Sequence, residues 1–202
     1  MTDEPRLDEP RLAGQLAFLL EADRLKQVER RTTIVGGERR ENSAEHSWHL
    51  ALFALVLAEY AEDSVDLPRV LTMLLLHDLV EVDAGDTFIY DEDGMASKSE
   101  REEAAATRLF GLLPSEQGTE LRALWEEFEA RQTPDARFAG ALDRLQPVLL
   151  NHANDGGGWR EHGIEAARVR AVNGHIAEGS AALWVAALAR IDDAVARGFI
   201  AG

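Results

Sequence analysis

Two adjacent ionisable residues, His77 and Asp78, close the apolar run Leu71–Leu76 and lead into Leu79-Val80-Glu81. A helix that has just buried several consecutive leucines has no packing use for such a pair, because removing ionisable groups from water is costly unless a metal or a partner compensates. The pair therefore constrains the fold. Other segments of the chain must bring compensating groups to this point.

Composition limits what those groups can be. The 202-residue chain contains no cysteine, which excludes a disulfide framework and leaves imidazole and carboxylate as the strong metal ligands. Its length and its 46% apolar residues predict one domain with a substantial core. A net charge of -16 is a poor match for a polyanion, so we expect no DNA or RNA partner.

The chain also lacks signals for membranes and export. No apolar run approaches the ~20 residues of a membrane span. The N-terminal segment MTDEPRLDEPRL is acidic and lacks the basic and apolar regions of a signal peptide. We therefore expect a cytoplasmic protein without membrane contact.

Helix start and stop signals divide the chain into seven or eight helices, with almost no alternating strand pattern. We expect residues 1–11 to be a flexible terminus and residues 12–202 to form a single all-α domain, with a metal-site core at about 42–150 and C-terminal helices at about 160–200. Gly36-Gly37 predicts a turn, and residues 86–99 predict a loop long enough to be a lid. The expected helices span 12–28, 42–57, 66–85, from 97 or 99 to 113, 114–125, from 133 through 143, 164–176 and 180–195.

Two further residues can complete a metal site with the pair. Asn42 and Glu45 have the spacing of a capping box, which places His46 in the first turn of a helix. Asp143 interrupts the apolar pattern of a later helix. Two imidazole nitrogens and two carboxylate oxygens would leave open positions on a roughly octahedral ion. Each residue alone could also be an ordinary helix residue, His46 partly exposed and Asp143 on the surface. The adjacent pair is harder to explain in that way.

The pattern of histidine, histidine-aspartate and a later aspartate resembles that of the HD-domain phosphohydrolases. The closer resemblance is to the HD-domain 5′-deoxynucleotidases and their uncharacterised relatives. It covers roughly residues 12–150 and implies an HD-type helical bundle that hydrolyses phosphate esters with a divalent metal. The matching residues are Leu25-Lys26, Arg31-Thr32, Glu41–Trp48, His77–Glu81, Gly85-Asp86 and Asp143.

The resemblance implies a role for each matching position. The implied metal ligands are His46, His77, Asp78 and Asp143. Glu81 would be the catalytic carboxylate, which could deprotonate the attacking water or protonate the leaving alkoxide, although it could also be a plain exposed glutamate. Asp86 would act at the site and contact the nucleoside sugar, with a competing role as a cap in the loop. Arg31 would contact the phosphate, since a planar guanidinium suits a phosphomonoester dianion.

Two departures bear on the substrate. Thr32 follows the arginine where the characterised deoxynucleotidases usually carry a tryptophan. The stretch 151–162, with Gly156-Gly157-Gly158 and Trp159, is closer to the uncharacterised relatives. This stretch could cover the entrance of the site, and Trp159 could equally be a packing residue.

The expected cofactor is one divalent ion: Mn²⁺, Co²⁺, Fe²⁺, Ni²⁺ or Zn²⁺. No histidine lies between Asp78 and Asp143, which favours a mononuclear site. We expect hydrolysis of the phosphomonoester of (deoxy)nucleoside 5′-monophosphates. The alternatives are another phosphorylated or cyclic nucleotide, or a metal-stabilised binding or regulatory module without catalysis, against which the presence of Glu81 speaks. A homodimer agrees with the resemblance and with apolar helices such as 181–195, which could equally be core.

Overall fold

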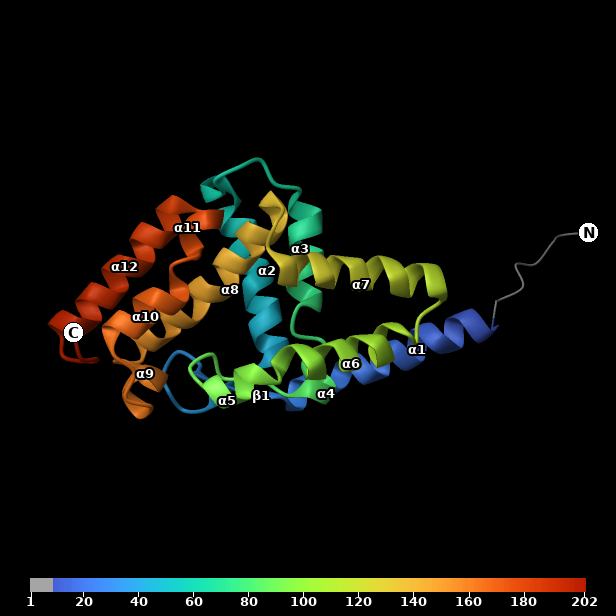
Figure 1. Ribbon diagram of the computed structural model, residues 1–202, viewed down its shortest axis with the longest axis horizontal. Coiled ribbons are helices and arrows are strands. Elements are labelled where there is room, and N and C mark those ends of the chain that lie inside the picture. Colours follow the sequence, from blue (N-terminus) through green and yellow to red (C-terminus); the bar gives the residue numbers. More distant parts are fainter. Residues whose placement is uncertain (1–8) are drawn as a thin grey trace, which may run out of the picture.

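The computed structural model describes residues 9–202, apart from the side chain of Glu92, and these are almost entirely helical (Figure 1). The all-α expectation is confirmed. The α-helices are α1 (Glu9–Asp23), α2 (Ser43–Leu57), α3 (Leu67–Leu76), α4 (Glu81–Ala84), α5 (Glu92–Ala96), α6 (Lys98–Phe110), α7 (Ser115–Ala130), α8 (Pro134–Ala153), α9 (Gly157–Glu161), α10 (Ala166–Asn173), α11 (Ile176–Gly179) and α12 (Ala181–Ala196). Two 3-10 helices, η1 (Arg24–Gln27) and η2 (Ala58–Tyr60), and two strands, β1 (Glu29–Thr33) and β2 (Arg40–Asn42), complete the described elements.

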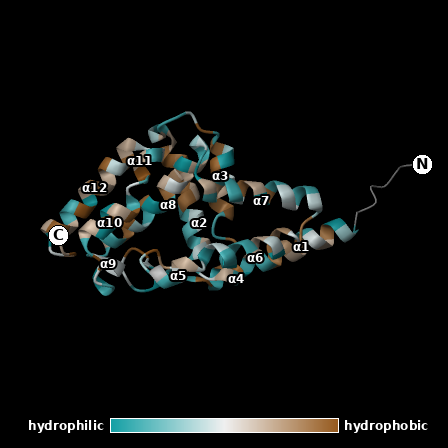
Figure 2. Ribbon diagram, viewed as in Figure 1, coloured by the Kyte–Doolittle hydropathy of each residue, from teal (hydrophilic) through white to brown (hydrophobic). Residues whose placement is uncertain are grey.

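Helix α8 is the central element of the fold. It packs against α2, α3, α7, α11 and α12, and it buries Phe138, Leu142 and Leu145 at helical spacing. In Figure 2 the hydrophobic stretches of α3 and α8 lie where the helices meet. Asp143 is therefore held inside the protein, between two of the core leucines.

Several predicted helix starts are confirmed by their caps. The side chains of Asn42, Asp66, Thr133 and Ser180 each accept a hydrogen bond from a backbone N–H in the first turn. Asn42 and Glu45 form the complete capping box. These caps fix where α2, α3, α8 and α12 begin, and so they position the side chains in the first turn of α2.

The antiparallel pair of β1 and β2 was not predicted. The sequence indicated a helix as far as Val28, but α1 ends at Asp23, η1 follows, and Val28 is extended. The strand Glu29–Thr33 contains no apolar residue, so the alternation that predicts a half-buried strand is missing. Gly36 and Gly37 form the predicted turn, with φ of 98° and 71°.

The helix before the His-Asp pair ends earlier than predicted. α3 stops at Leu76, residues 77–80 form turns, and α4 begins at Glu81. The N–H groups of Leu79 and Glu81 donate to the carbonyl oxygens of Leu76 and Asp78, at 3.0 and 2.9 Å. These i→i−3 bonds are tighter than those of an α-helix. A continuous apolar run hides such a turn, so the expectation of one helix from 66 to 85 was wrong.

Three other boundaries also differ. α1 begins at Glu9, inside the predicted flexible terminus, and residues 1–8 lie outside the described part of the chain. The predicted loop at 86–99 contains the short helix α5, and the glycine-rich break after Asn154 contains α9. Short helices escape a periodicity argument because they span too few residues to show a repeat.

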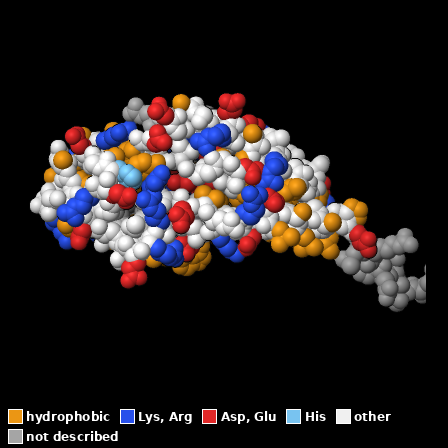
Figure 3. Space-filling view, turned by 90° about the horizontal axis from the view of Figure 1, so that it is seen from below, with side chains coloured by type: hydrophobic (Ala, Val, Ile, Leu, Met, Phe, Trp, Pro, Cys, Tyr) orange, Lys and Arg blue, Asp and Glu red, His pale blue; other side chains and the backbone are white. Residues whose placement is uncertain are grey.

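Exposed leucines gather over α1, as the hydrophobic side chains at the right of Figure 3 show. Leu16, Leu19 and Leu20 are among them. No helix within residues 9–202 is long and apolar enough to cross a membrane.

Candidate metal centre

The structure brings all four predicted ligands together. His46 lies in the first turn of α2, His77 and Asp78 form the turn after α3, and Asp143 comes from the middle of α8. Each of the four is buried, with at most 9% of its surface exposed. Three segments distant in sequence thus meet at one point, which the His-Asp pair required.

The distances between these side chains suit a shared ion. One ligand atom from each of His46, His77 and Asp143 lies within 4.8 Å of the other two. The Nε2 of His46 is 3.1 Å from Asp143 Oδ1 and 4.0 Å from Asp78 Oδ2. The Nε2 of His77 is 3.0 Å from Asp78 Oδ1. Bonds of ~2.1 Å to one ion place neighbouring ligand atoms ~3 Å apart and opposite ones ~4 Å apart.

The two histidines present their Nε2 atoms to this point. The Nδ1 of His77 donates to the carbonyl oxygen of Leu74 at 2.9 Å, and the Nδ1 of His46 donates to Gln146 Oε1 at 3.2 Å. In the neutral rings Nε2 is then the unprotonated nitrogen, as metal binding requires. The buried Nε2 of His77 has no hydrogen-bond partner within residues 9–202. A divalent metal would satisfy this atom, so the residues present fit the ion.

A buried carboxylate, Glu41, stands behind His46. Its Oε2 lies 3.5 Å from the Nδ1 of His46, and its Oε1 accepts a hydrogen bond of 2.6 Å from Gln146 Nε2. A carboxylate on the far side of a ligating imidazole orients the ring and makes it more basic. Sequence reasoning missed this role, although the segment beginning at Glu41 was one of those that carried the resemblance.

Glu81 is buried beside the ligands, which rules out the plain exposed glutamate. The hydroxyl of Ser43 donates to its Oε2 at 2.6 Å. Burial, followed by the negative charge of Asp78, raises the pKa of the Glu81 carboxyl well above its usual range. The carboxyl can therefore hold a proton at higher pH than an ordinary glutamate, which suits general acid–base catalysis.

The guanidinium at the cluster belongs to Arg30. Its Nη1 donates to Asp78 Oδ2 at 2.6 Å and lies 3.9 Å from Asp86 Oδ1. Burial opposes the charge of Arg30, but the carboxylates, led by Asp78, outweigh burial and raise its pKa. Arg31 is exposed at the next position of β1 and lines the adjacent cavity. The side chains of adjacent strand residues point to opposite faces. Which of the two arginines reaches the cluster therefore depends on the register of strand β1, which the sequence did not predict.

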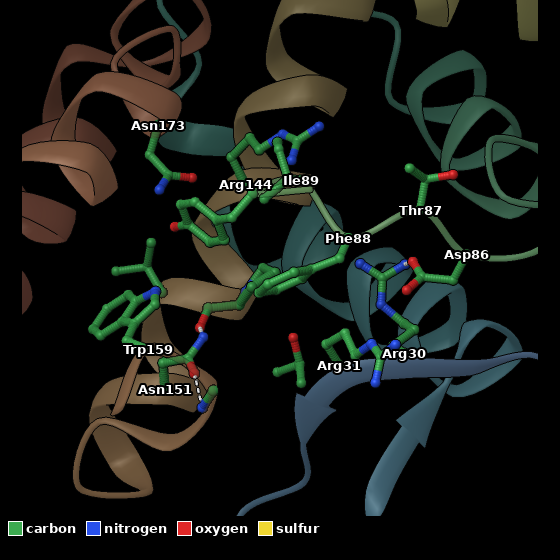
Figure 4. Close-up of a pocket in the computed structure, with 15 residues that line it drawn as sticks. Arg30, Arg31, Asp86, Thr87, Phe88, Ile89, Arg144, Asn151, Trp159 and Asn173 are labelled. Carbon is green, nitrogen blue, oxygen red and sulfur yellow. Dashed lines mark hydrogen bonds and ion pairs between the residues drawn. The ribbon is translucent and has the colours of Figure 1, made fainter. Parts of the chain in front are cut away.

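Asp86 follows Gly85, which has a φ of 73° and ends α4. Its side chain is 14% exposed and faces Arg30 (Figure 4). Burial is the largest cause that raises the pKa of the Asp86 carboxyl. The positive charge of Arg30 partly offsets it, and the negative charge of Asp78 adds to it. The structure thus brings Asp86 to the site, as expected.

A cavity of about 80 Å³ adjoins the cluster on the side of Arg30 and Asp86 (Figure 4). Trp159 is buried in its wall and forms a hydrogen bond with Tyr90, so this residue is both packed and cavity-lining. The glycine-rich turn holds α9 in place, because the N–H of Gly158 donates to Asn151 Oδ1 at 2.7 Å. Thr32, the residue that the sequence analysis singled out as a departure from the resembling family, lines the same cavity.

A mainly helical bundle in which α2, the turn after α3 and α8 enclose buried His, His-Asp and Asp side chains defines a class of metal-binding proteins. The sequence pattern of the HD domain family matches residues 22–184. The 5′-deoxynucleotidase HDDC2 of Mus musculus is 32% identical over 138 residues, which cover 68% of this chain and 68% of the mouse protein. The protein of the same name from Homo sapiens is 31% identical over 135 residues, 66% of this chain and 65% of the human protein.

Solved structures agree with this match. A crystal structure described as a predicted metal-dependent phosphohydrolase from Magnetospirillum magnetotacticum MS-1 is 53% identical and superposes with a TM-score of 0.93, over 98% of this chain and 100% of that one. A conserved hypothetical protein from Pyrococcus furiosus shares the fold at 19% identity and a TM-score of 0.63, over 89% of this chain and 98% of that one. The chain belongs to the HD domain family.

Proposed function

We propose that this protein hydrolyses the phosphomonoester of (deoxy)nucleoside 5′-monophosphates, with one divalent ion held by His46, His77, Asp78 and Asp143. The observation that carries the proposal is the buried Nε2 of His77, which has no hydrogen-bond partner among the described residues and lies close to the ligand atoms of His46, Asp78 and Asp143, beside the protonatable Glu81. Membership of the HD domain family and the phosphohydrolase and 5′-deoxynucleotidase relatives support it. The protein is a metal-dependent phosphohydrolase.

A bound divalent ion would supply two things at this site: it neutralises phosphate charge and lowers the pKa of a bound water. Two imidazole nitrogens and two carboxylate oxygens accept Mn²⁺, Co²⁺, Fe²⁺, Ni²⁺ or Zn²⁺. Within residues 9–202 no other group of three or more metal-binding side chains is close enough to hold an ion. This supports a mononuclear site.

Glu81 acts as the general base and general acid of the reaction. Hydrolysis forms a bond between a water oxygen and phosphorus and breaks the bond between phosphorus and the 5′ oxygen. The water loses a proton, and the leaving 5′ oxygen gains one. The hydroxyl of Ser43 holds the Glu81 carboxyl in place at 2.6 Å. The raised pKa of that carboxyl lets it take up the first proton and donate the second.

Two cationic side chains are suited to the phosphate. Arg30 reaches the cluster with a guanidinium that contacts Asp78 and approaches Asp86, so it can bind phosphate oxygens beside the metal. Arg31 lines the cavity mouth, where its charge would act on a bound nucleotide. Asp86 lines the same cavity and would accept a hydrogen bond from the sugar hydroxyl.

A nucleotide panel tests the proposal. Wild-type protein loaded with Mn²⁺ or Co²⁺ is assayed with mono-, di-, triphosphate and cyclic nucleotides, and both phosphate and nucleoside are measured. We expect equal release of the two from deoxynucleoside 5′-monophosphates. Glu81→Gln should lower kcat by ~10²-fold or more with metal content unchanged, whereas Glu45→Gln, which preserves the capping box, serves as the control. No release from any monophosphate would reject the proposal.

The ligand assignment has its own test. Asp143→Ala removes a buried ligand from the centre of α8, so the purified variant should retain no metal after dialysis. Metal content is measured by plasma mass spectrometry, and circular dichroism confirms that the helices persist. A variant that still holds one ion per chain would show that the fourth ligand is misassigned.

We also propose that two copies of the chain pair through the outer face of α2. Trp48 is 62% exposed there, flanked by two shallow grooves and followed on the same helix by exposed Leu52 and Val56. Large exposed aromatic side chains are typical centres of protein interfaces. Helix α12, the earlier candidate, instead buries Leu183, Ala187, Ile191 and Ala194 in the core.

Light scattering tests this pairing. We expect a mass of two chains for the wild type, one chain for Trp48→Glu, and two for Val185→Glu, a control at an exposed valine of α12. A monomeric wild type, or a dimeric Trp48→Glu, contradicts the assignment.

We further propose that the protein works in the cytoplasm. A chain without cysteine is compatible with a reducing compartment.

A further inference from the structure

A second cavity, of about 420 Å³, adjoins the first at the segment Thr87–Ile89. The two cavities share Thr87, Ile89 and Arg144 as lining residues. Arg144 directly follows Asp143 on α8, and Figure 4 shows its side chain beside Ile89 at the edge of the first cavity. The junction of the two cavities is thus one residue from a proposed metal ligand.

Within the described part of the chain, Arg144 has one carboxylate in reach, that of Asp143. Its side chain is 23% exposed, and its buried Nε forms no hydrogen bond. The carboxylate nearest to it within residues 9–202 is Asp143, whose Oδ2 lies 3.4 Å from that Nε. A guanidinium carries five N–H donors, and buried donors are normally satisfied. Because Asp143 is also a proposed metal ligand, Arg144 retains donors for an incoming anion.

A second arginine, Arg131, lies in the wall of the same cavity. Its Nη1 contacts the Nε2 of His175 at 2.7 Å. Burial, followed by the positive charges of Arg131 and Arg144, lowers the pKa of His175 to about 4, so the neutral ring accepts this hydrogen bond. Within the described residues, Arg131 has no carboxylate at salt-bridge distance.

The backbone of Arg131 is also unusual. It has a φ of 51° and a ψ of 34° at the C-terminal end of α7, a conformation in which glycine is the ordinary residue. Its side chain lies over Gly140 of α8, where an added Cβ would be 3.3 Å from the Arg131 Nε. This conformation is uncommon for a residue other than glycine, and it places the Arg131 side chain in the wall of the second cavity.

The glutamates that line the second cavity are already paired with other cations. The pairs are Lys98 with Glu102 and Glu129, and Arg122 with Glu103 and Glu126. Arg131 and Arg144 are therefore the cavity's cations without a carboxylate of their own, apart from the contact of Arg144 with Asp143. In a chain with a net charge of -16, two neighbouring guanidinium groups without such partners predict an anionic ligand.

We propose that Arg131 and Arg144 bind a second phosphate group of the substrate, so that the preferred substrate is a nucleotide that carries another phosphate besides the one hydrolysed. This inference rests on the proposed function of the metal centre. Water adds to the phosphorus at the metal centre, and the bond from that phosphorus to its leaving oxygen breaks. The leaving oxygen is the 5′ ester oxygen in a 3′,5′-bisphosphate and the oxygen that bridges the two phosphates in a 5′-diphosphate, and it takes a proton. Inorganic phosphate leaves, and the second phosphate stays on the product. A planar guanidinium fork suits phosphate oxygens, and two of them suit a dianion.

The test compares kcat/KM of the Mn²⁺-loaded enzyme for three substrates: a deoxynucleoside 5′-monophosphate, its 3′,5′-bisphosphate and its 5′-diphosphate. The wild type should favour at least one of the two-phosphate nucleotides by tenfold or more. Arg144→Gln and Arg131→Gly should bring that ratio to within threefold of unity. Arg170→Gln, which removes the same charge at the exposed pair with Asp192, should leave the ratio unchanged.

The variants also guard against a folding artefact. Arg131→Gly places glycine at a left-handed position, so its melting temperature should equal or exceed that of the wild type while the ratio falls. Calorimetric binding of the same nucleotides separates the two claims. If the wild type hydrolyses nothing, the proposed function fails, yet a binding preference lost in both variants still supports this subsite. No preference in the wild type, or one that survives both substitutions, overturns the inference.

Discussion

Replacing Glu41 by glutamine should weaken metal binding without unfolding the protein. Glu41 is 3% exposed, and its Oε2 lies 3.5 Å from the Nδ1 of His46. Losing a carboxylate behind a ligating histidine typically lowers metal affinity ~10–100-fold. Here Gln146 also accepts from the same Nδ1, at 3.2 Å, and so preserves the ring orientation. We therefore expect the lower part of that range, ~10–30-fold, or ~1.4–2 kcal/mol.

The assay is a competition titration of metal-free protein with Co²⁺ or Zn²⁺ against a chelator of known affinity. Glu45→Gln makes the same chemical change four residues along the chain, in the first turn of α2, and glutamine preserves the capping box, so its affinity should match the wild type. A Glu41→Gln variant whose dissociation constant stays within twofold of the wild type would refute the reasoning, because it would mean that the carboxylate neither orients nor polarises His46.

Three further predictions concern stability. Removing the metal with a chelator should lower the melting temperature, because the ion binds the folded chain preferentially; calorimetry with and without Mn²⁺ measures this. Gly179→Ala should lower the free energy of unfolding by ~2 kcal/mol in urea titrations, since its Cβ would lie 2.3 Å from the Arg137 carbonyl oxygen. Gly174→Ala should change it little, because its Cβ would lie 3.5 Å from the Arg170 carbonyl oxygen, an ordinary contact distance. Because the pKa of His175 falls to about 4 on folding, the unfolded chain binds more protons below pH ~6.5, so this residue should make stability decline as pH drops from ~6.5 towards 4. His175→Gln should flatten that decline by ~1–2 kcal/mol after allowance for solvent screening, again in urea titrations.

The ligand cluster could be predicted because its constraints are local. The His-Asp pair after an apolar run shows itself without any tertiary information, and the capping box at Asn42 fixes the first turn of α2. Asp143 stands out because it interrupts an apolar helix face. Each of these signals depends on one segment alone, which is the range over which sequence patterns are informative.

The parts that were missed depend on contacts between segments. Arg30 and Arg31 are equivalent in sequence, and only the register of β1 places Arg30 at the cluster and leaves Arg31 at the cavity wall. The turn at 77–80 is hidden in an apolar run, and the role of Glu41 follows from its distance to His46. That Asp143 is the carboxylate in reach of Arg144 within the described residues becomes visible only when the glutamates around it are assigned to their own cations.

The central claim is that one divalent ion is held by His46, His77, Asp78 and Asp143. The most direct measurement is an anomalous difference map from a crystal grown with Mn²⁺. We predict one peak per chain, in contact with the Nε2 atoms of both histidines and with both aspartate carboxylates. Two peaks at the site, a peak elsewhere, or a peak that leaves Asp143 uncoordinated would contradict the account.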